Sequence, residues 1–364
     1  MKTSRIIHVT AYYPPHLGGQ EIVVQDLVTQ LALTGEQVEV VTSSVGARTG
    51  VSVENGVLVS RLKSGEFAHT AIIWRLFFWL LWHTRRSAIV HLHVGQFFTP
   101  EAVWLAAKIK RFRYILHLHS DLVQSGPMGR FLPLYKKLFF GREIRDAELV
   151  IVLNNEHRQV VRRDYGYDSK LLVMFNGIGE DFFKVSRKPT ESTTLKLLFV
   201  GRLSPHKNLT ALLEALSMIK RRITLDIIGD GECRREIETL IAGKKLENVK
   251  LHGTLSRDEV KRFYVTCDAL ILPSLYEVQP IVLLEAMASR IPVIVTKGIG
   301  IEATAREAVL IEPTAQGVAD GIESFDAMSP DAQELLVDAA FKRAEKHRWH
   351  ALISSYIDLY DGIA

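Results

Sequence analysis

Residues 273 to 288 have the sequence PSLYEVQPIVLLEAMA and place two carboxylates, Glu277 and Glu285, eight positions apart around an expected helix start. The preceding residues 269–272 form a short apolar run typical of a buried strand, and Pro280 is well placed as the first residue of the following helix. Glu277 then lies on the loop, and Glu285 lies more than one turn inside the helix. Because open α/β sheets bind ligands at the carboxyl ends of their strands, we expect both carboxylates to face a shared crevice there.

The start of the same helix also offers backbone donors. The N–H groups near Ile281 and Val282 lie in the first turn, where a helix leaves such groups without an internal partner. They would present a partial positive charge to an anionic ligand. The sequence therefore predicts a site where acceptors for hydroxyl groups and donors for phosphate converge.

With this spacing, the chain resembles the retaining nucleotide-sugar enzymes of glycosyltransferase family 4, in which a Glu, seven residues and a second Glu mark the donor site. Further matches follow the family's order along most of the chain, at Pro14-Pro15 with Gly18-Gly19, at Asn176-Gly177-Ile178, and at residues 198–203 followed by Lys207-Asn208. The resemblance implies the GT-B fold, an α/β architecture of two Rossmann-like parallel-sheet domains facing a cleft. It also implies transfer of a sugar from a nucleoside diphosphate to an acceptor hydroxyl with retained anomeric configuration.

The length of 364 residues and the alternation of short apolar runs with longer periodic segments predict two domains, each built of strand-helix units around a mainly parallel sheet. We expect strands at residues 6–9, 37–42, 89–92, 114–118, 149–153 and 171–174, and again at 196–200, 224–228, 249–251, 269–272, 293–296 and 308–311. A polar, Pro-containing run breaks the periodicity after Gly177, which indicates a linker at 178–194. The domains are then 1–177 and 195–345. By the resemblance, the first binds the acceptor and the second the nucleotide-sugar donor, and a C-terminal helix at 346–364 packs back on the first.

Composition excludes several classes of protein. Hydrophobic residues make up 47% of the chain and charged residues 24%, as in an ordinary globular protein. The net charge of +4 favours anionic ligands or an anionic membrane surface, but it is too small to indicate a nucleic-acid partner. Cys233 and Cys267 show no metal-like pairing and are expected to be reduced. No secretory signal and no apolar run of about 20 residues is visible, so we expect a cytoplasmic protein.

Two cations follow the expected strand 196–200 at its carboxyl end. Arg202 would hold a diphosphate by its bidentate fork, and Lys207 would act as a point charge. Cations already in place are sufficient to stabilise a departing phosphate, and the sequence contains no Asp-x-Asp triplet. We therefore expect no divalent metal and no other cofactor. The alternative for both residues is a solvated face.

The carboxylates and the glycines have different implied roles. By the resemblance, Glu285 accepts hydrogen bonds from two ribose hydroxyls, and Glu277 contacts the donor sugar. The alternative is that both are solvated surface acids. Gly18 and Gly19 would let the backbone approach a phosphate or sugar, or they form a plain turn. Many members of the family carry a Gly-aromatic-Gly run after the first Glu, whereas residues 278–280 are VQP here, so the donor sugar stays unassigned.

Two pairs of histidines, His91 with His93 and His117 with His119, would each lie on one face of a strand. A metal site is one alternative, and hydrogen-bonded core histidines are the commoner outcome. His119, at a strand end, matches the position where the family carries a histidine near the sugar, with Asp121 placed either to orient it or to cap the next segment. We expect four catalytic residues, namely His119, Glu277, Arg202 and Lys207.

The first domain also carries candidate membrane-binding segments at 71–86 and 130–142. Residues 71–82 are apolar on nearly all sides of a helix, more than one sheet can bury, and Arg85-Arg86 and the basic-aromatic run at 130–142 supply charge for anionic headgroups. We hypothesise a peripheral contact with the inner membrane face, from which the enzyme reaches a lipid-linked acceptor or glycan precursor. The alternative is a buried helix or a protein interface. Rival functions are a nucleotide-sugar epimerase, a non-catalytic nucleotide-sugar binding protein and a histidine-based metal hydrolase.

Overall fold

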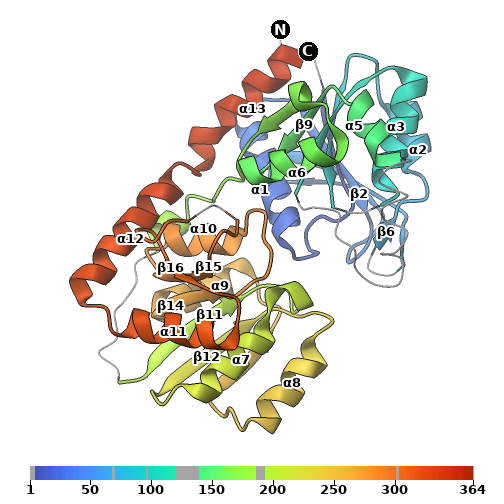
Figure 1. Ribbon diagram of the computed structural model, residues 1–364. Helices are drawn as coiled ribbons and strands as arrows, with labels where there is room; N and C mark the ends of the chain where they lie inside the picture. Colours follow the sequence, from blue (N-terminus) through green and yellow to red (C-terminus); the bar gives the residue numbers. More distant parts are fainter. Residues whose placement is uncertain are drawn as a thin grey trace. The chain divides into compact units, whose positions relative to one another are not determined.

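The computed structural model describes residues 5–67, 70–95, 97–119, 139–185, 193–300 and 303–363. The chain divides into two compact units, one of Met1–Gly177 with Trp349–Ala364, and one of Ile178–Arg348. Each unit is an α/β domain whose sheet is covered by helices (Figure 1).

The first unit contains an eight-stranded sheet in the order β10-β9-β8-β7-β1-β2-β4-β3. All neighbours are parallel except β3 and β4. The strands are β1 (Ile6–Thr10), β2 (Val38–Ser43), β3 (Gly50–Glu54), β4 (Val57–Leu62), β7 (Ile89–Val94), β8 (Arg113–Leu118), β9 (Leu149–Val152) and β10 (Leu171–Val173). A strand is present at each of the six expected positions, which confirms the first set of predicted strands. The ends differ from the predicted ones by one or two residues.

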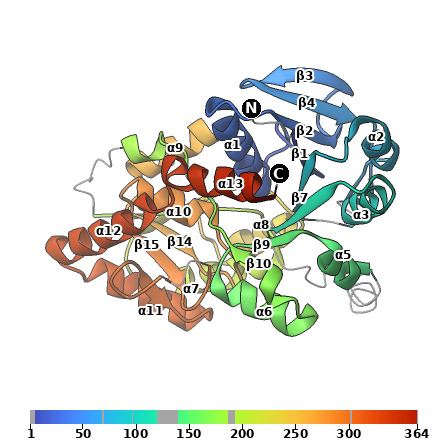
Figure 2. The ribbon, with the colours of Figure 1, turned by 90° about the horizontal axis from the view of Figure 1, so that it is seen from above.

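The hairpin of β3 and β4 was not predicted. It forms the edge of the sheet beside β2 (Figure 2). Asn55 and Gly56 connect its strands, both at positive φ, 50° and 79°. An Asn-Gly pair between alternating valines is a strong hairpin signal, because such a turn needs two left-handed residues. That signal was present in the sequence and would have located the hairpin.

The helices of the first unit cover both faces of its sheet. They are α1 (Gly19–Leu33), α2 (Leu76–His83), α3 (Thr99–Lys110), α5 (Gly141–Asp146), α6 (Asn155–Tyr165) and α13 (Trp349–Ile363). Val9, Leu92 and Leu116 belong to a core cluster with residues of α2, α3 and α5, while α13 packs beside α1. The expected helix at 71–82 is wrong at its start, because Thr70–Ile72 forms β6, paired antiparallel with β5 (Gly65–Phe67). No helix among the described residues is both long and apolar enough to span a bilayer.

The second unit contains a six-stranded sheet in the order β13-β12-β11-β14-β15-β16, parallel throughout. Its strands β11 (Leu195–Val200), β12 (Ile223–Ile228), β13 (Val249–Gly253), β14 (Ala269–Leu272), β15 (Val293–Thr296) and β16 (Val309–Ile311) confirm the second set of predictions. The helices are α7 (Leu209–Met218), α8 (Arg234–Gly243), α9 (Arg257–Thr266), α10 (Ile281–Ala288), α11 (Ala315–Asp326) and α12 (Pro330–Glu345). The strand order reverses between β11 and β14, which is where open sheets of this kind bind ligands.

The boundary between the units differs from the predicted linker. Residues 178–185 belong to the second unit, where Ile178 and Phe182 are fully buried in the core and the Ile178 N–H donates to the His347 carbonyl at 2.8 Å. The rest of the predicted linker up to residue 192 lies outside the described residues. The expected C-terminal helix starts at Trp349, not at residue 346. A Cβ on Gly177 would come within 2.2 Å of the Trp349 ring, so this close approach requires glycine.

Candidate active site

The loops that follow β11 and β14 bring Lys207 and Glu277 together. Lys207 ends the short 3₁₀ helix η5 (Pro205–Lys207), and its Nζ forms an ion pair with Oε1 of Glu277. The same carboxylate oxygen accepts a hydrogen bond from the Ser274 hydroxyl at 2.8 Å. Asn208, at φ 56°, donates to the carbonyls of Pro273 and Pro313, both at 3.0 Å. The asparagine therefore ties the two loops together at the point where the strand order reverses.

Arg202 lies in the same polar cluster. Its Nε is 3.1 Å from Oε2 of Glu232, and both side chains are about half-exposed. A Cβ on Gly229 would come within 1.9 Å of the Gly201 carbonyl, so glycine lets the turn after β12 pack against the loop that carries Arg202. Burial lowers the pKa of His206, and the neighbouring Lys207 charge lowers it further.

Sequence reasoning did not select His206 or Glu232 as site residues. The charges of Lys207 and Arg202 lower the pKa of the His206 imidazole, and those of Glu277 and Glu232 raise it, so the imidazole belongs to the same polar cluster. His206 precedes Lys207, and Glu232 ends the glycine turn after β12, so position after a strand was the signal that could have found them.

Glu285 lies in α10 with a different set of partners. It is buried, and its Oε1 is 3.4 Å from Nε of Arg257, the first residue of α9. Burial and the nearby Glu285 carboxylate raise the pKa of Tyr264, whose hydroxyl donates to the Val282 carbonyl at 3.2 Å. The alternative of a solvated surface acid is therefore wrong for Glu285. That Glu285 and Glu277 face one crevice stays a prediction.

The start of α10 differs slightly from expectation. Pro280 is not the first helical residue but the N-cap, because its ψ of 113° is extended. Ile281 and Val282 then occupy the first turn, and the Leu283 N–H donates to the Pro280 carbonyl at 3.1 Å. The predicted pair of backbone donors is placed at a helix N-terminus, where the macrodipole favours an anion.

In the first unit, α1 begins at Gly19, with Gly18 as its N-cap in an extended conformation. A Cβ on Gly18 would lie 2.2 Å from Oε2 of Glu21, a carboxylate that also contacts Nδ1 of His16 at 3.1 Å. A Cβ on Gly19 would meet no atom within 4 Å. A side chain at position 18 would displace the Glu21 carboxylate, whereas Gly19 borders open space.

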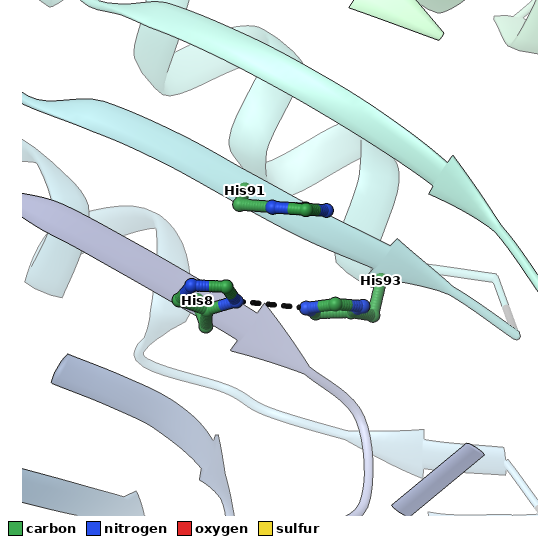
Figure 3. A group of neighbouring side chains, drawn as sticks. All are labelled: His8, His91 and His93. Atoms are coloured by element: carbon green, nitrogen blue, oxygen red, sulfur yellow. Dashed lines mark hydrogen bonds between the residues drawn. The ribbon is translucent and has the colours of Figure 1, made fainter. Parts of the chain in front are cut away.

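The predicted histidine pairs lie on one face of the sheet, as strand alternation requires, and His8 joins them. His8 comes from β1, His91 and His93 from β7, His117 from β8, and His119 follows β8. Figure 3 shows the rings of His8 and His93 end to end, with His91 beside them. The ring centroids of His91 and His93 are 4.5 Å apart, and those of His117 and His119 are 4.2 Å apart. Among the described residues, the metal alternative applies to two groups, His8 with His91 and His93, and His93 with His117 and His119, because the ligand atoms within each group lie within 4.8 Å of one another.

A strand was expected at residues 6–9, but His8 was not grouped with the other histidines. Its pairing opposite His91 follows from the parallel register of β1 and β7. Asp121 and most of the segment 130–142 lie outside the described residues, so their predicted roles stay predictions.

Two family models match the chain. The model described as Glycosyltransferase Family 4 matches residues 17–182, and the model described as Glycosyl transferases group 1 matches residues 180–342. With the two parallel-sheet domains, these matches define the class as glycosyltransferases of the GT-B fold. The chain belongs to the group 1 glycosyltransferases.

Named relatives agree with this assignment. An uncharacterized glycosyltransferase of Methanocaldococcus jannaschii is 25% identical and covers 98% of this chain and 97% of its own. A putative teichuronic acid biosynthesis glycosyltransferase of Bacillus subtilis is 25% identical over 65% of this chain and 61% of its own. The structure of HepE from Anabaena in complex with UDP-glucose has a TM-score of 0.81 at 16% identity, covering 99% of this chain and 100% of that one. This last likeness shows the shared fold.

Proposed function

We propose that this glycosyltransferase moves a sugar from a nucleoside-diphosphate sugar to an acceptor hydroxyl, with retained anomeric configuration and without a divalent metal. The observation that carries the proposal is the pairing of Lys207 with Glu277 where the strand order of the second sheet reverses. A cation suited to a diphosphate and a carboxylate suited to sugar hydroxyls are held side by side there. HepE, which shares the fold, was solved with UDP-glucose, and this supports a sugar nucleotide as donor.

Cleavage of the donor leaves negative charge on the departing diphosphate. Lys207, Arg202 and the backbone N–H groups of Ile281 and Val282 are proposed to stabilise that charge. In the structure Lys207 pairs with Glu277 and Arg202 with Glu232. A diphosphate is also an oxyanion, so it can exchange with these carboxylates, and the site needs no metal ion to supply positive charge.

The remaining contacts are proposed to orient the donor. Glu277 and His119 contact the sugar, and Glu285 contacts the ribose hydroxyls. The burial of the Glu285 carboxylate beside Arg257 supports this role. Gly19, open to solvent, would let the backbone of the first turn of α1 approach a phosphate or sugar. Retention of configuration is proposed on the family resemblance.

Donor turnover in single variants tests the proposal. We expect Lys207→Met to lower kcat roughly 10²-fold, as the loss of one transition-state partner does. Lys244→Met, at the exposed end of α8, is the matched control and should keep full activity. Turnover should also survive dialysis against a chelator.

Three results would contradict the proposal. Unchanged turnover of Lys207→Met would remove the site assignment. Conversion of the donor to an isomeric sugar nucleotide without acceptor would indicate an epimerase. Nucleotide-sugar binding with no released nucleotide would indicate a binding protein.

The acceptor is proposed to be a lipid-linked or other glycan precursor, reached from a membrane surface. Trp74, Phe78 and Trp82, on and beside α2, are 65%, 50% and 75% exposed, while Leu76 and Leu80 are buried against the domain. The charged residues nearby, Arg75, Arg85 and Arg86, are exposed as well. Aromatic rings with flanking cations are suited to an anionic lipid surface.

A further inference from the structure

The histidines of the first unit form two separate chains of side-chain hydrogen bonds. In one, Nδ1 of His8 contacts Nε2 of His93 at 2.9 Å, and Nδ1 of His93 contacts Nε2 of His119 at 2.9 Å (Figure 3 shows the first of these contacts). In the other, the Tyr360 hydroxyl contacts Nδ1 of His91 at 2.6 Å, and Nε2 of His91 contacts Nδ1 of His117 at 3.2 Å. Among the described residues, only the first of these hydrogen-bond chains reaches His119.

The geometry favours hydrogen bonds over metal coordination. A bound metal would require lone pairs that converge on one point about 2.0–2.1 Å from each nitrogen. Here the ring of His91 stacks on the rings of His8 and His93, with interplanar angles of 27° and 11°. The lone pairs of these stacked rings lie in the ring planes, so they run side by side instead of converging. Both nitrogens of His93 are already engaged by neighbouring imidazoles.

All members of the first chain are neutral. Burial lowers the pKa of His8 to about 3 and that of His119 to about 3, and it holds the pKa of His93 well below its usual range. A neutral imidazole carries one N–H donor and one acceptor nitrogen. Because His93 uses both nitrogens, it donates through one and accepts at the other. The donors of the whole chain therefore run in one direction, either toward His119 or toward His8.

The surroundings of His8, at the inner end of the hydrogen-bond chain, decide in which direction its donors point. Nε2 of His8 is buried and has no hydrogen-bond partner among the described residues. If the donors ran inward, this nitrogen would carry a buried N–H without an acceptor, which is the rarer kind of unsatisfied group. If they run outward, His8 donates to His93 and His93 donates to Nε2 of His119. The proton of His119 is then on Nδ1, which no described residue engages.

We propose that His93, backed by His8, is a positioning residue that holds His119 in its Nδ1–H tautomer, so that His119 presents a hydrogen-bond donor rather than a base. The part that this donor plays rests on the proposed function, in which His119 contacts the donor sugar. A neutral N–H at that position would bind a sugar oxygen. It would not abstract a proton from the acceptor hydroxyl.

Nitrogen NMR of the full chain with ¹⁵N-labelled histidine tests the tautomer directly. We expect His119, assigned by its loss in His119→Ala, to show a protonated Nδ1 and an unprotonated Nε2. In His93→Leu the signals should shift toward a mixture of tautomers. His93→Asn, whose amide can replace the lost Nδ1 donor, should restore the wild-type pattern. His91→Leu, equally buried on the same strand but in the other chain, should leave the His119 tautomer unchanged.

Kinetics separate positioning from simple packing. We expect His93→Leu to lower kcat about 5- to 10-fold, the equivalent of one lost hydrogen bond, with KM little changed, and His93→Asn to recover most of it. A protonated Nε2 in wild-type His119, an unchanged tautomer in His93→Leu, or one equivalent of bound zinc would each overturn the proposal. If the tautomer is as expected but His119→Ala keeps full turnover, the proposed contact with the sugar is wrong and the hydrogen-bond chain stands.

Discussion

At the scale of single residues, the first unit buries an acidic side chain in its interior. Glu143 of α5 is fully buried, and neither of its carboxylate oxygens has a hydrogen-bond partner among the described residues. Burial, with a smaller contribution from Glu101, raises the pKa of Glu143 to about 9. The side chain is therefore protonated in the folded state at neutral pH, where the unfolded chain would ionise it.

This raised pKa predicts how stability depends on pH. The folded state binds one proton more than the unfolded state between about pH 4.5 and pH 9, so the free energy of unfolding falls as the pH rises through that window. Glu143→Gln removes this dependence. We expect it to unfold several degrees above wild type at pH 8 and close to wild type at pH 5, measured as thermal midpoints. The exposed Glu148→Gln should match wild type at both values. An equal midpoint for Glu143→Gln and wild type at pH 8 would contradict the assignment.

At the scale of elements, α2 divides its apolar residues between two environments. Leu76 and Leu80 are in the core, and the stacked rings of Phe78 and Trp82, 5.6 Å apart, are on the surface. Nearly all sides of the helix Leu76–His83 are apolar, and only one side can pack against the sheet. An exposed aromatic patch of this kind marks an interaction surface.

Vesicle flotation tests what this surface binds. We expect the protein to float with vesicles that contain anionic lipid and to stay in solution with neutral vesicles. Changing Trp74 and Trp82 together to Ser should abolish flotation. Leu335→Ser, which removes an equally exposed apolar side chain from α12, is the control. Equal recovery of the Trp variant and wild type would exclude this membrane contact.

At the scale of the whole molecule, the polar cluster of the second unit predicts stabilisation by ligand. A sugar nucleotide that binds only the folded state should raise the unfolding free energy by about 2.7 kcal/mol at a hundredfold excess over Kd. For a unit of this size that is a shift of roughly 5–10 °C. A thermal-shift panel of nucleotide sugars should show one preferred base, and Lys207→Met should reduce the shift. Free sugars serve as the control, and no shift with any nucleotide sugar would contradict the donor proposal.

The sequence was sufficient for features that depend on local pattern. The twelve expected strands are present because their apolar runs and the periodic segments between them report burial within a few residues. The placement of Glu277 on a loop and of Glu285 inside the next helix was predicted for the same reason, since both belong to one strand-to-helix segment. Their binding of a donor stays a proposal. The β3–β4 hairpin carried an equally local signal, at Asn55-Gly56, that the prediction overlooked.

Tertiary structure decided which distant residues meet. Lys207 and Glu277 are 70 positions apart in the sequence. They pair because the strands that precede them, β11 and β14, are neighbours in the sheet. His8 joins His93 because β1 lies beside β7, and Tyr360 reaches His91 because the C-terminal helix returns to the first unit. Periodicity describes only the faces of single elements. Strand order and helix packing are set by burial over the whole domain, and they alone bring these side chains within hydrogen-bonding distance.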